Sequence, residues 1–445
     1  MKRLRTLLAA ALACAAAPAF TAPVAEQAVR ADVDGIDLVV LATGVEGVVT
    51  LVGTLPAGDD RSPVDNVALA TLTGAMLDKG TTRRDKFALA QQLGDVGAAI
   101  GFGVGASTLQ MSGKCLGKDL PLVVSLLAEQ LRLPAFSDAE FAKLKKQYVG
   151  LIRKQLEDTD FRAQDAFLRS IYPAGHPNRP ASPEEMLAAL DRTTLDEVRR
   201  FHARYYGPAG MRLVVVGDVD PKVVQAEVRK AFAGWQGGVA TDTDARAARL
   251  PAGATEIVQM PDKTNVSVVI GQPTLLRYAD DDALALRMAT RVLGSGFTGR
   301  LMANVRDREG LTYGIGASVD NDIFVDGDWS ISGNFAPNLL SQGLASTDRE
   351  LDKWYREGVT AAELERVKTQ VAGSYRVGLA TTGGMAGTIL RMLNAGMPLS
   401  FVDDYPKQVA ALTLDQVNGA IKRHLDPAKM MRVQAGTVPT ASAAK

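Results

Sequence analysis

The chain contains two copies of one unit. Residues 194–219 align without a gap on residues 413–438 at an offset of 219, and eleven of the twenty-six aligned positions are identical. Upstream, residues 139–153 match residues 362–376 at an offset of 223, keeping Ala, Glu, Lys, Gln, Gly and Arg. A repeat on this scale predicts two homologous domains of about 220 residues each, fused in one chain.

Each copy ends in a helix, a turn and a strand. In the first copy, TLDEV has the features of a helix start, with Thr193 or Thr194 as N-cap and acidic residues in the first turn. Pro208 and Gly210 then break the chain before the apolar run MRLVVVGDV, which predicts a buried strand. Further strands are predicted around Ile36, Val49, Leu109, Val266 and Ile331, with apolar-periodic helices such as LPLVVSLLAEQL between them. Because strands and helices do not alternate strictly, we expect α+β domains, each a largely antiparallel sheet with helices packed on one face.

The N-terminus has the features of a secretory signal peptide. The basic start MKRLR precedes an apolar run from Leu7 and small residues that end near Ala22, and the apolar run is too short to span a membrane stably. We therefore expect a periplasmic or secreted protein with no transmembrane anchor. Lipid attachment at Cys14 is a further option, although Ala11 stands where a lipid-attachment box prefers Leu. The predicted organisation is a signal peptide 1–22, an N-terminal domain 23–233, a linker 234–254 rich in Gly, Ala and Asp, and a C-terminal domain 255–440.

The chain lacks the residue patterns of the commonest hydrolases. Its three histidines, His176, His202 and His424, have no other His or Cys three or four residues away, so no helix presents the usual pair of zinc ligands. A turn is predicted at His176, a helix of the first copy at His202, and the matching helix of the second copy at His424. We find no nucleophile elbow, Walker loop or Ser/His/Asp grouping, and Cys115 is predicted to be a core residue. Fifty basic residues balance fifty acidic ones, so nucleic acid is not an expected partner.

The stretch VRDREGLTYGIGA, residues 305–317, holds the strongest candidate site. Arg306 and Tyr313 stand seven residues apart, around a glycine, where a charged segment joins an apolar one. The spacing alone is explained if Arg306 is a solvated helix residue and Tyr313 a half-buried strand residue. The alternative interpretation is that the pair forms half of an active site.

Together, the repeat and this pair resemble the pitrilysin/insulinase family of zinc metallopeptidases, whose bacterial and mitochondrial members are built from subunits of two homologous α+β domains. In that family the segment reads approximately RL…LRE..GL.Y, and Arg306 and Tyr313 fall on its Arg and Tyr. The segments that carry the resemblance are GIDLVVLATGVEGVVTLVGTLPAGDDRSP, MLDKGT, IYPAGHP, YYGPAGMRLVVVGDVDP and GSGFTGRLMANVRDREGLTYGIGA.

The first copy departs from the family at the zinc motif. The inverted motif HxxEH should come shortly before KGT, which is present, and this register puts Thr71 and Ala75 in the two His places and Gly74 in the Glu place. The downstream Glu ligand of the family should lie near Ile152, whereas the nearest acid, Glu157, is off register. A catalytic zinc needs three protein ligands. The resemblance therefore implies that this chain holds no zinc.

In the family, the Arg and Tyr of the second domain close over a substrate bound at the zinc of the first, and when the two halves reside on different chains neither is active alone. A phenol O–H can donate to a developing oxyanion, and a guanidinium can hold a backbone carbonyl or orient the phenol. The resemblance thus implies an exported, non-zinc subunit of a heterodimeric peptidase. It would pair with an HxxEH-bearing homologous subunit that carries the zinc, and act on peptides or unfolded polypeptides.

Two alternatives remain at this point. One is a non-catalytic scaffold or peptide-binding protein of the same fold. The other is an independently active metalloprotease, which requires ligands that the sequence does not offer.

Overall fold

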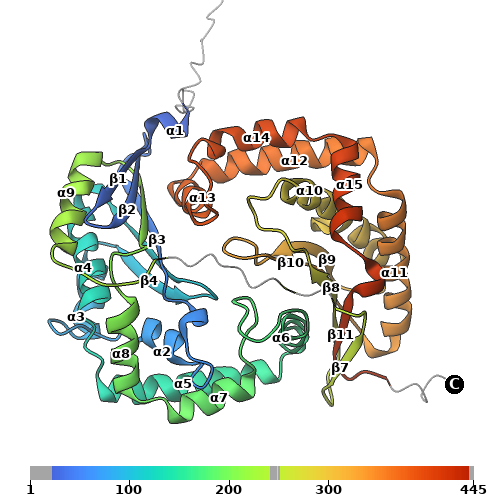
Figure 1. The fold of residues 1–445 in the computed structure, drawn as a ribbon, viewed down its shortest axis with the longest axis horizontal. Coiled ribbons are helices and arrows are strands. Elements are labelled where there is room, and N and C mark those ends of the chain that lie inside the picture. Colours follow the sequence, from blue (N-terminus) through green and yellow to red (C-terminus); the bar gives the residue numbers. More distant parts are fainter. Residues whose placement is uncertain (1–22, 241–247, 249–250, 440–445) are drawn as a thin grey trace, which may run out of the picture.

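The computed structural model describes residues 23–240, 248 and 251–439 (Figure 1). The predicted signal peptide with Cys14 lies outside the described residues, as do parts of the predicted linker and the last residue of the predicted C-terminal domain. The described chain forms two sheets, each with its own set of helices around it (Figure 1).

The two sheets repeat one strand pattern. The first has the order β1-β2-β6-β3-β5-β4 and the second β7-β11-β8-β10-β9. Each contains one parallel pair, β2 with β6 and β7 with β11, and all other neighbours are antiparallel. This confirms the predicted α+β class with largely antiparallel sheets. The strands are β1 Val29–Val33, β2 Ile36–Ala42, β3 Val48–Leu55, β4 Ala99–Val104, β5 Leu109–Leu116, β6 Arg212–Gly217, β7 Thr255–Gln259, β8 Val266–Pro273, β9 Ile315–Asp320, β10 Asp328–Phe335 and β11 Met431–Gly436.

The helices begin where local chemistry favours it. Thr194 and Thr413, equivalent in the repeat, each cap a helix with a capping box that satisfies backbone N–H groups of the first turn. The α-helices are α1 Val24–Gln27, α2 Leu69–Met76, α3 Lys86–Asp95, α4 Leu120–Arg132, α5 Asp138–Leu156, α6 Thr159–Ile171, α7 Pro183–Arg192, α8 Leu195–Tyr205, α9 Pro221–Phe232, α10 Ala283–Gly294, α11 Leu340–Glu357, α12 Ala361–Leu379, α13 Thr382–Asn394, α14 Phe401–Ala411 and α15 Leu414–His424.

One face of each sheet packs on helices of its own half. Along β5, buried and exposed residues alternate, so that Leu109, Met111 and Cys115 enter the core while the residues between them face away. The second core is built around Trp329 and Trp354, whose rings stack with centroids 5.6 Å apart. Cys115 is buried in the first core, as predicted.

The other face of each sheet is covered in part by a helix from the opposite half, which the sequence did not lead us to expect. Helix α6, from the first half, packs on β8 and β11, and α13, from the second, packs on β3 and β6 (Figure 1). Each helix begins with a threonine that bonds to a hydroxyl on the sheet it covers. Thr382 and Thr50 lie 2.9 Å apart through their hydroxyls, and Ser267 donates to Thr159 over the same distance. We call this reciprocal arrangement the helix exchange.

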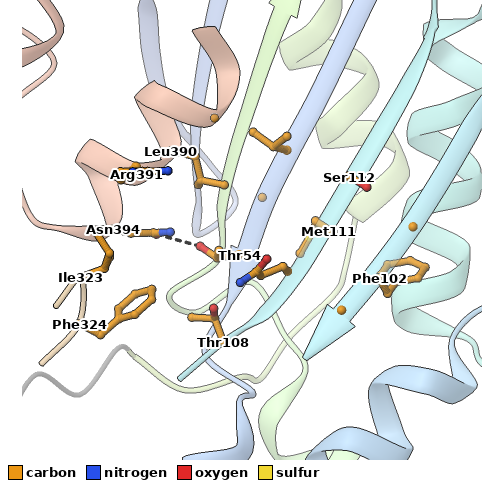
Figure 2. A pocket seen from close by; sticks show the side chains of 16 residues that line it. Thr54, Phe102, Thr108, Met111, Ser112, Ile323, Phe324, Leu390, Arg391 and Asn394 are labelled. Carbon is orange, nitrogen blue, oxygen red and sulfur yellow. Dashed lines mark hydrogen bonds between the residues drawn. The ribbon is translucent and has the colours of Figure 1, made fainter. Parts of the chain in front are cut away.

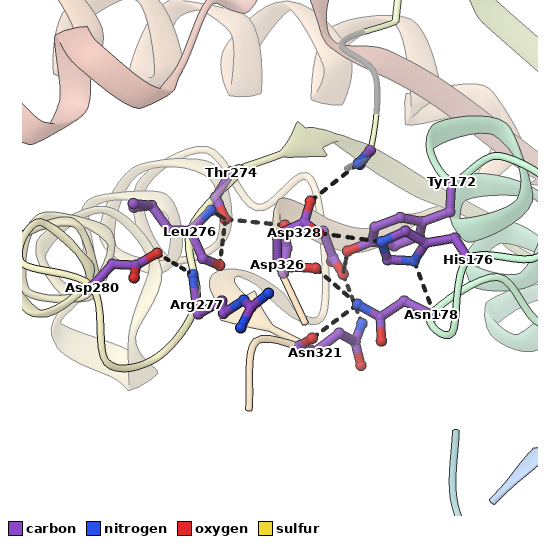
Figure 3. Close-up of polar contacts among 12 residues, drawn as sticks. Tyr172, His176, Asn178, Thr274, Leu276, Arg277, Asp280, Asn321, Asp326 and Asp328 are labelled. Carbon is purple, nitrogen blue, oxygen red and sulfur yellow. Dashed lines mark hydrogen bonds and ion pairs between the residues drawn. The ribbon is translucent and has the colours of Figure 1, made fainter. Parts of the chain in front are cut away.

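A buried polar cluster joins the halves beside α6 (Figure 3). Tyr172, directly after α6, donates its hydroxyl to Asp328 at 3.0 Å. His176 stacks on the Tyr172 ring and makes a 3.3 Å contact from Nε2 to Asp326. Its Nδ1 accepts from the backbone N–H of Asn178, so Nε2 carries the proton and donates. The predicted turn at His176 therefore contacts the second half of the chain.

Asp328 should make stability depend on pH. Burial raises its pKa to about 7, whereas an unfolded Asp titrates near 3.9. Stability from this group is therefore complete below about pH 4 and is lost as the pH rises through about 7. Asp328→Asn keeps an acceptor for Tyr172 but cannot ionise. Its free energy of unfolding, relative to the unmutated chain, should rise by more than about 1 kcal/mol between about pH 5 and pH 8.

Urea denaturation at both pH values measures this difference. The exposed Asp415→Asn, on α15, serves as a control and should show a smaller change. A relative stability of Asp328→Asn that stays flat or falls with pH would contradict the expectation.

Candidate functional site

The structure brings Arg306 and Tyr313 together on the surface. Arg306 lies in the π-helix Met302–Arg308, and Tyr313 lies in the loop before β9. The guanidinium carbon of Arg306 is 5.6 Å from the centre of the Tyr313 ring and 5.2 Å from the centre of the Phe297 ring. Tyr313 is 86% exposed and Phe297 70%. The cation thus lies over two exposed rings, within the range of cation–π attraction.

Ion pairs hold the backbone on both sides of Arg306. Arg300 donates to both carboxylate oxygens of Glu363 on α12, each at 2.7 Å. These hydrogen bonds lower the pKa of Glu363 to about 2, so the ion pair is intact at neutral pH. Glu309 accepts from Arg349 on α11 at 3.0 Å. Within the part of the chain that the structure describes, no hydrogen bond engages the Tyr313 hydroxyl, so the fold does not use this donor.

Tyr313 also adjoins an edge strand and a cavity. β9 is the last strand of its sheet, so one side of its backbone has no strand partner among the described residues. A cavity of about 450 Å³ lies beside it, lined by β9, by β8 and β10, and by residues of α6 that include Asp160. The first half has an equivalent cavity of about 500 Å³ between β3, β4, β5 and α13 (Figure 2).

The place expected for a zinc site lies on two packed helices. Thr71, Gly74 and Ala75 are on α2, and Ile152 is on α5, which packs against α2. The Thr71 hydroxyl donates to Asp59 at 2.9 Å, and burial raises the pKa of Asp59 to about 6. One hydroxyl, a methyl group and a buried isoleucine do not supply three zinc ligands.

Steric crowding at Gly74 leads to the same conclusion. A Cβ built on Gly74 would lie 2.4 Å from Val104 Cγ2 and 3.1 Å from Leu109 Cδ1. Apolar side chains of β4 and β5 therefore fill the space that a catalytic carboxylate would need. The residues at this place do not fit a catalytic zinc.

The histidines have structural partners. His202 donates from Nε2 to the carbonyl oxygen of Leu131 at 2.8 Å, and His424 Nε2 lies 2.7 Å from Asp282 Oδ2. Over residues 23–240, 248 and 251–439, no cluster of three or more His, Cys, Asp or Glu residues is arranged to hold a metal. In the same residues, no helix combines the length and apolar character needed to cross a bilayer.

Within this chain, Arg306 and Tyr313 do not contact the helices that carry the positions expected for the zinc ligands. Among the described residues, no hydrogen bond, ion pair or ring contact links either side chain to α2 or α5. Other residues near these sites and cavities were not predicted from the sequence. Phe297 could have been noticed as an aromatic residue between glycines in GSGFTGR. Asp59, and Arg391 and Asn394 of the first-half cavity, give no local signal, because only tertiary packing brings them into place.

Comparison with known sequences gives a family match. Residues 192–371 match the model of the peptidase M16 inactive domain. An uncharacterized zinc protease of Streptomyces coelicolor is 26% identical over 375 residues, which cover 82% of this chain and 79% of the relative. The non-peptidase homolog YmxG of Helicobacter pylori is 22% identical over 384 residues, which cover 83% of this chain and 84% of that protein.

Solved structures share the fold over most of the chain. The crystal structure of a peptidase M16 inactive domain from Pseudomonas fluorescens matches with a TM-score of 0.85 and 25% identity, covering 93% of this chain and 98% of that one. A protease from Helicobacter pylori matches with a TM-score of 0.83 and 18% identity, covering 92% and 98%. These matches confirm the predicted fold and the resemblance to the metallopeptidase family.

Proposed function

Because residues 192–371 match the model of the peptidase M16 inactive domain, we propose that this protein is an exported, non-zinc subunit of a heterodimeric peptidase. It pairs with an HxxEH-bearing homologous subunit and supplies Arg306 and Tyr313 to the active site that forms around the partner's zinc. The substrates are peptides or unfolded polypeptides. The match to a family model described as inactive, and the relative named a non-peptidase homolog, support a subunit without peptidase activity of its own.

One observation carries the proposal: the Arg306–Tyr313 pair is exposed and held in place, while α2 does not fit a zinc ion. A tyrosine kept for packing is normally buried, with its hydroxyl bonded. Tyr313 is instead 86% exposed, and no described residue engages its hydroxyl. Arg306 lies against its ring and that of Phe297. Such a donor is available to a group brought by another molecule.

The chemistry of the pair suits peptide hydrolysis. When bound in the partner subunit, zinc would polarise the scissile carbonyl and activate water. Tyr313 would donate its O–H to the carbonyl oxygen as negative charge develops there. The planar guanidinium of Arg306 would orient the phenol and hold a backbone carbonyl of the substrate. An extended substrate would add a strand to an open sheet edge.

A second candidate is a scaffold or peptide-binding protein that takes no part in catalysis. The cavities beside β4 and β9 favour it, because they would hold a peptide without any zinc partner. A scaffold does not account for the exposed Arg306–Tyr313 pair, so we place this candidate second.

Purification from native cells tests the proposal. An affinity-tagged chain should bring down an HxxEH-bearing relative in a one-to-one complex that cleaves peptides and holds about one zinc ion. The same chain purified alone should hold no stoichiometric zinc and cleave no peptide, as measured by elemental analysis and a peptidase assay. One tightly bound zinc in the chain alone, lost on chelation together with activity, would refute the proposal. A relative that is fully active without this chain would favour the scaffold.

A further inference from the structure

The first-half cavity lies against the edge strand β4 (Figure 2). β4 is the edge strand of its sheet, and its alternate residues Gly101 and Gly103 lie on the face turned away from the first core. A Cβ on Gly103 would meet no atom within 4 Å. On β5, Ser112 and Gln110 pair with these two glycines and face the same way. The cavity therefore has room for side chains directly beside an open strand edge.

Unused hydrogen-bond donors line the α13 side of the cavity. Asn394 Oδ1 accepts from the Thr54 hydroxyl at 3.0 Å and from Arg212 Nη1 at 3.2 Å, which fixes the amide. Among the described residues, nothing accepts from its Nδ2. Three residues earlier, the guanidinium of Arg391 has no hydrogen bond or ion pair within the described part of the chain. It is the only charged residue among the sixteen that line the cavity, so the cavity is cationic.

The internal repeat shows that the fold does not require this cation. The offset of 223 residues that aligns the sequences of α5 and α12 also aligns α6 with α13, and it places Leu168 where α13 has Arg391. The equivalent cavity in the second half is lined by Asp160 and by no basic residue. The same architecture thus forms with an acidic lining, and Arg391 is a property of the first-half cavity alone.

We propose that the first-half cavity binds an acidic side chain of an extended peptide and that Arg391 determines this specificity. A peptide strand added to β4 directs alternate side chains over Gly101 and Gly103 into the cavity. There, a Glu or Asp carboxylate accepts from the guanidinium of Arg391 and from Asn394 Nδ2, in charge-assisted hydrogen bonds. The inference rests on the proposed function only in taking peptides as the ligand class.

Peptide binding to the purified chain tests this inference without a partner or zinc. The probes are two fluorescein-labelled peptides of about nine residues, long enough to cover β4, that differ only by Glu or Gln at the central position. Fluorescence anisotropy should show that the unmutated chain binds the Glu peptide roughly tenfold more tightly. Arg391→Gln should make the two affinities equal, and Arg391→Lys should keep part of the preference.

Arg376→Gln is the matched control, because Arg376 is an exposed arginine on α12 that does not line the cavity. It removes the same charge and should keep the full preference. Equal binding of the two peptides by the unmutated chain, or a preference that survives Arg391→Gln, would overturn the inference. Failure to find a zinc-bearing partner would refute the proposed function but leave this result unchanged.

Discussion

Tyr313→Phe, in the complex with the HxxEH-bearing subunit, should lower kcat by roughly 10²–10³ while KM changes little. The substitution removes one donor to the developing oxyanion, a loss of about 2.7–4 kcal/mol in the transition state. The free energy of the bound ground state changes less, because the neutral substrate carbonyl is stabilised less by the hydrogen bond than the oxyanion is. Steady-state kinetics on a peptide substrate measures both constants.

Stability measurements separate this effect from a structural one. Tyr313 is 86% exposed and its hydroxyl has no partner among the described residues, so the melting temperature should not change. Tyr355→Phe, on α11, is the control and should leave kcat unaltered. Arg306→Lys should also reduce turnover, and the double variant should lose less than the product of the single losses, because both groups act on one substrate. Peptide turnover at the unmutated rate by Tyr313→Phe would show that the pair is structural.

Phe167→Ala should cost about 3–5 kcal/mol in the free energy of unfolding. Phe167 is fully buried on α6, within the cluster that joins this helix to β8 and β11. Its ring fills the space above Gly271, where a Cβ would lie 2.9 Å from the ring carbon Cζ. Truncation leaves a cavity between the two halves of the chain.

Urea denaturation, followed by circular dichroism and by tryptophan fluorescence, measures the loss. Two of the three tryptophans, Trp329 and Trp354, are buried in the second core, so fluorescence reports chiefly on the half that α6 covers. Phe87→Ala is the control, because Phe87 is 73% exposed, and it should change stability by less than about 0.5 kcal/mol. A Phe167→Ala chain as stable as the Phe87→Ala chain would mean that the helix exchange adds little to the fold.

Local patterns predicted much of the fold. The N-cap at Thr194 and the buried strand after Gly210 follow from neighbouring residues, and the repeat extends both to the second half. The edge strands β4 and β9 were missed because AIGFGV and IGASVD contain glycines, which weaken a strand pattern. The helix exchange was missed for another reason: an amphipathic helix shows which of its faces is buried, not which sheet covers it.

The candidate site, like the fold, was predicted only in part. The sequence spacing of Arg306 and Tyr313, read with the family resemblance, indicated a pair, and the structure places their side chains together. The sequence alone shows that Thr71 and Ala75 stand where zinc ligands would be. It does not show the crowding around Gly74, because Val104 comes from a strand about thirty residues away in the chain.

The helix exchange bears on the ancestry of the chain. When two units cover each other's sheets with equivalent helices, the contact has the twofold geometry of a dimer of identical units. A single ancestral unit, about half the present length, would have left that sheet face bare and would have needed a second copy to cover it. Fusion of two such units would release the copies from identity, since a substitution in one would no longer appear in the other. In the present chain Leu168 and Arg391 occupy equivalent helix positions, so the two equivalent cavities have different linings.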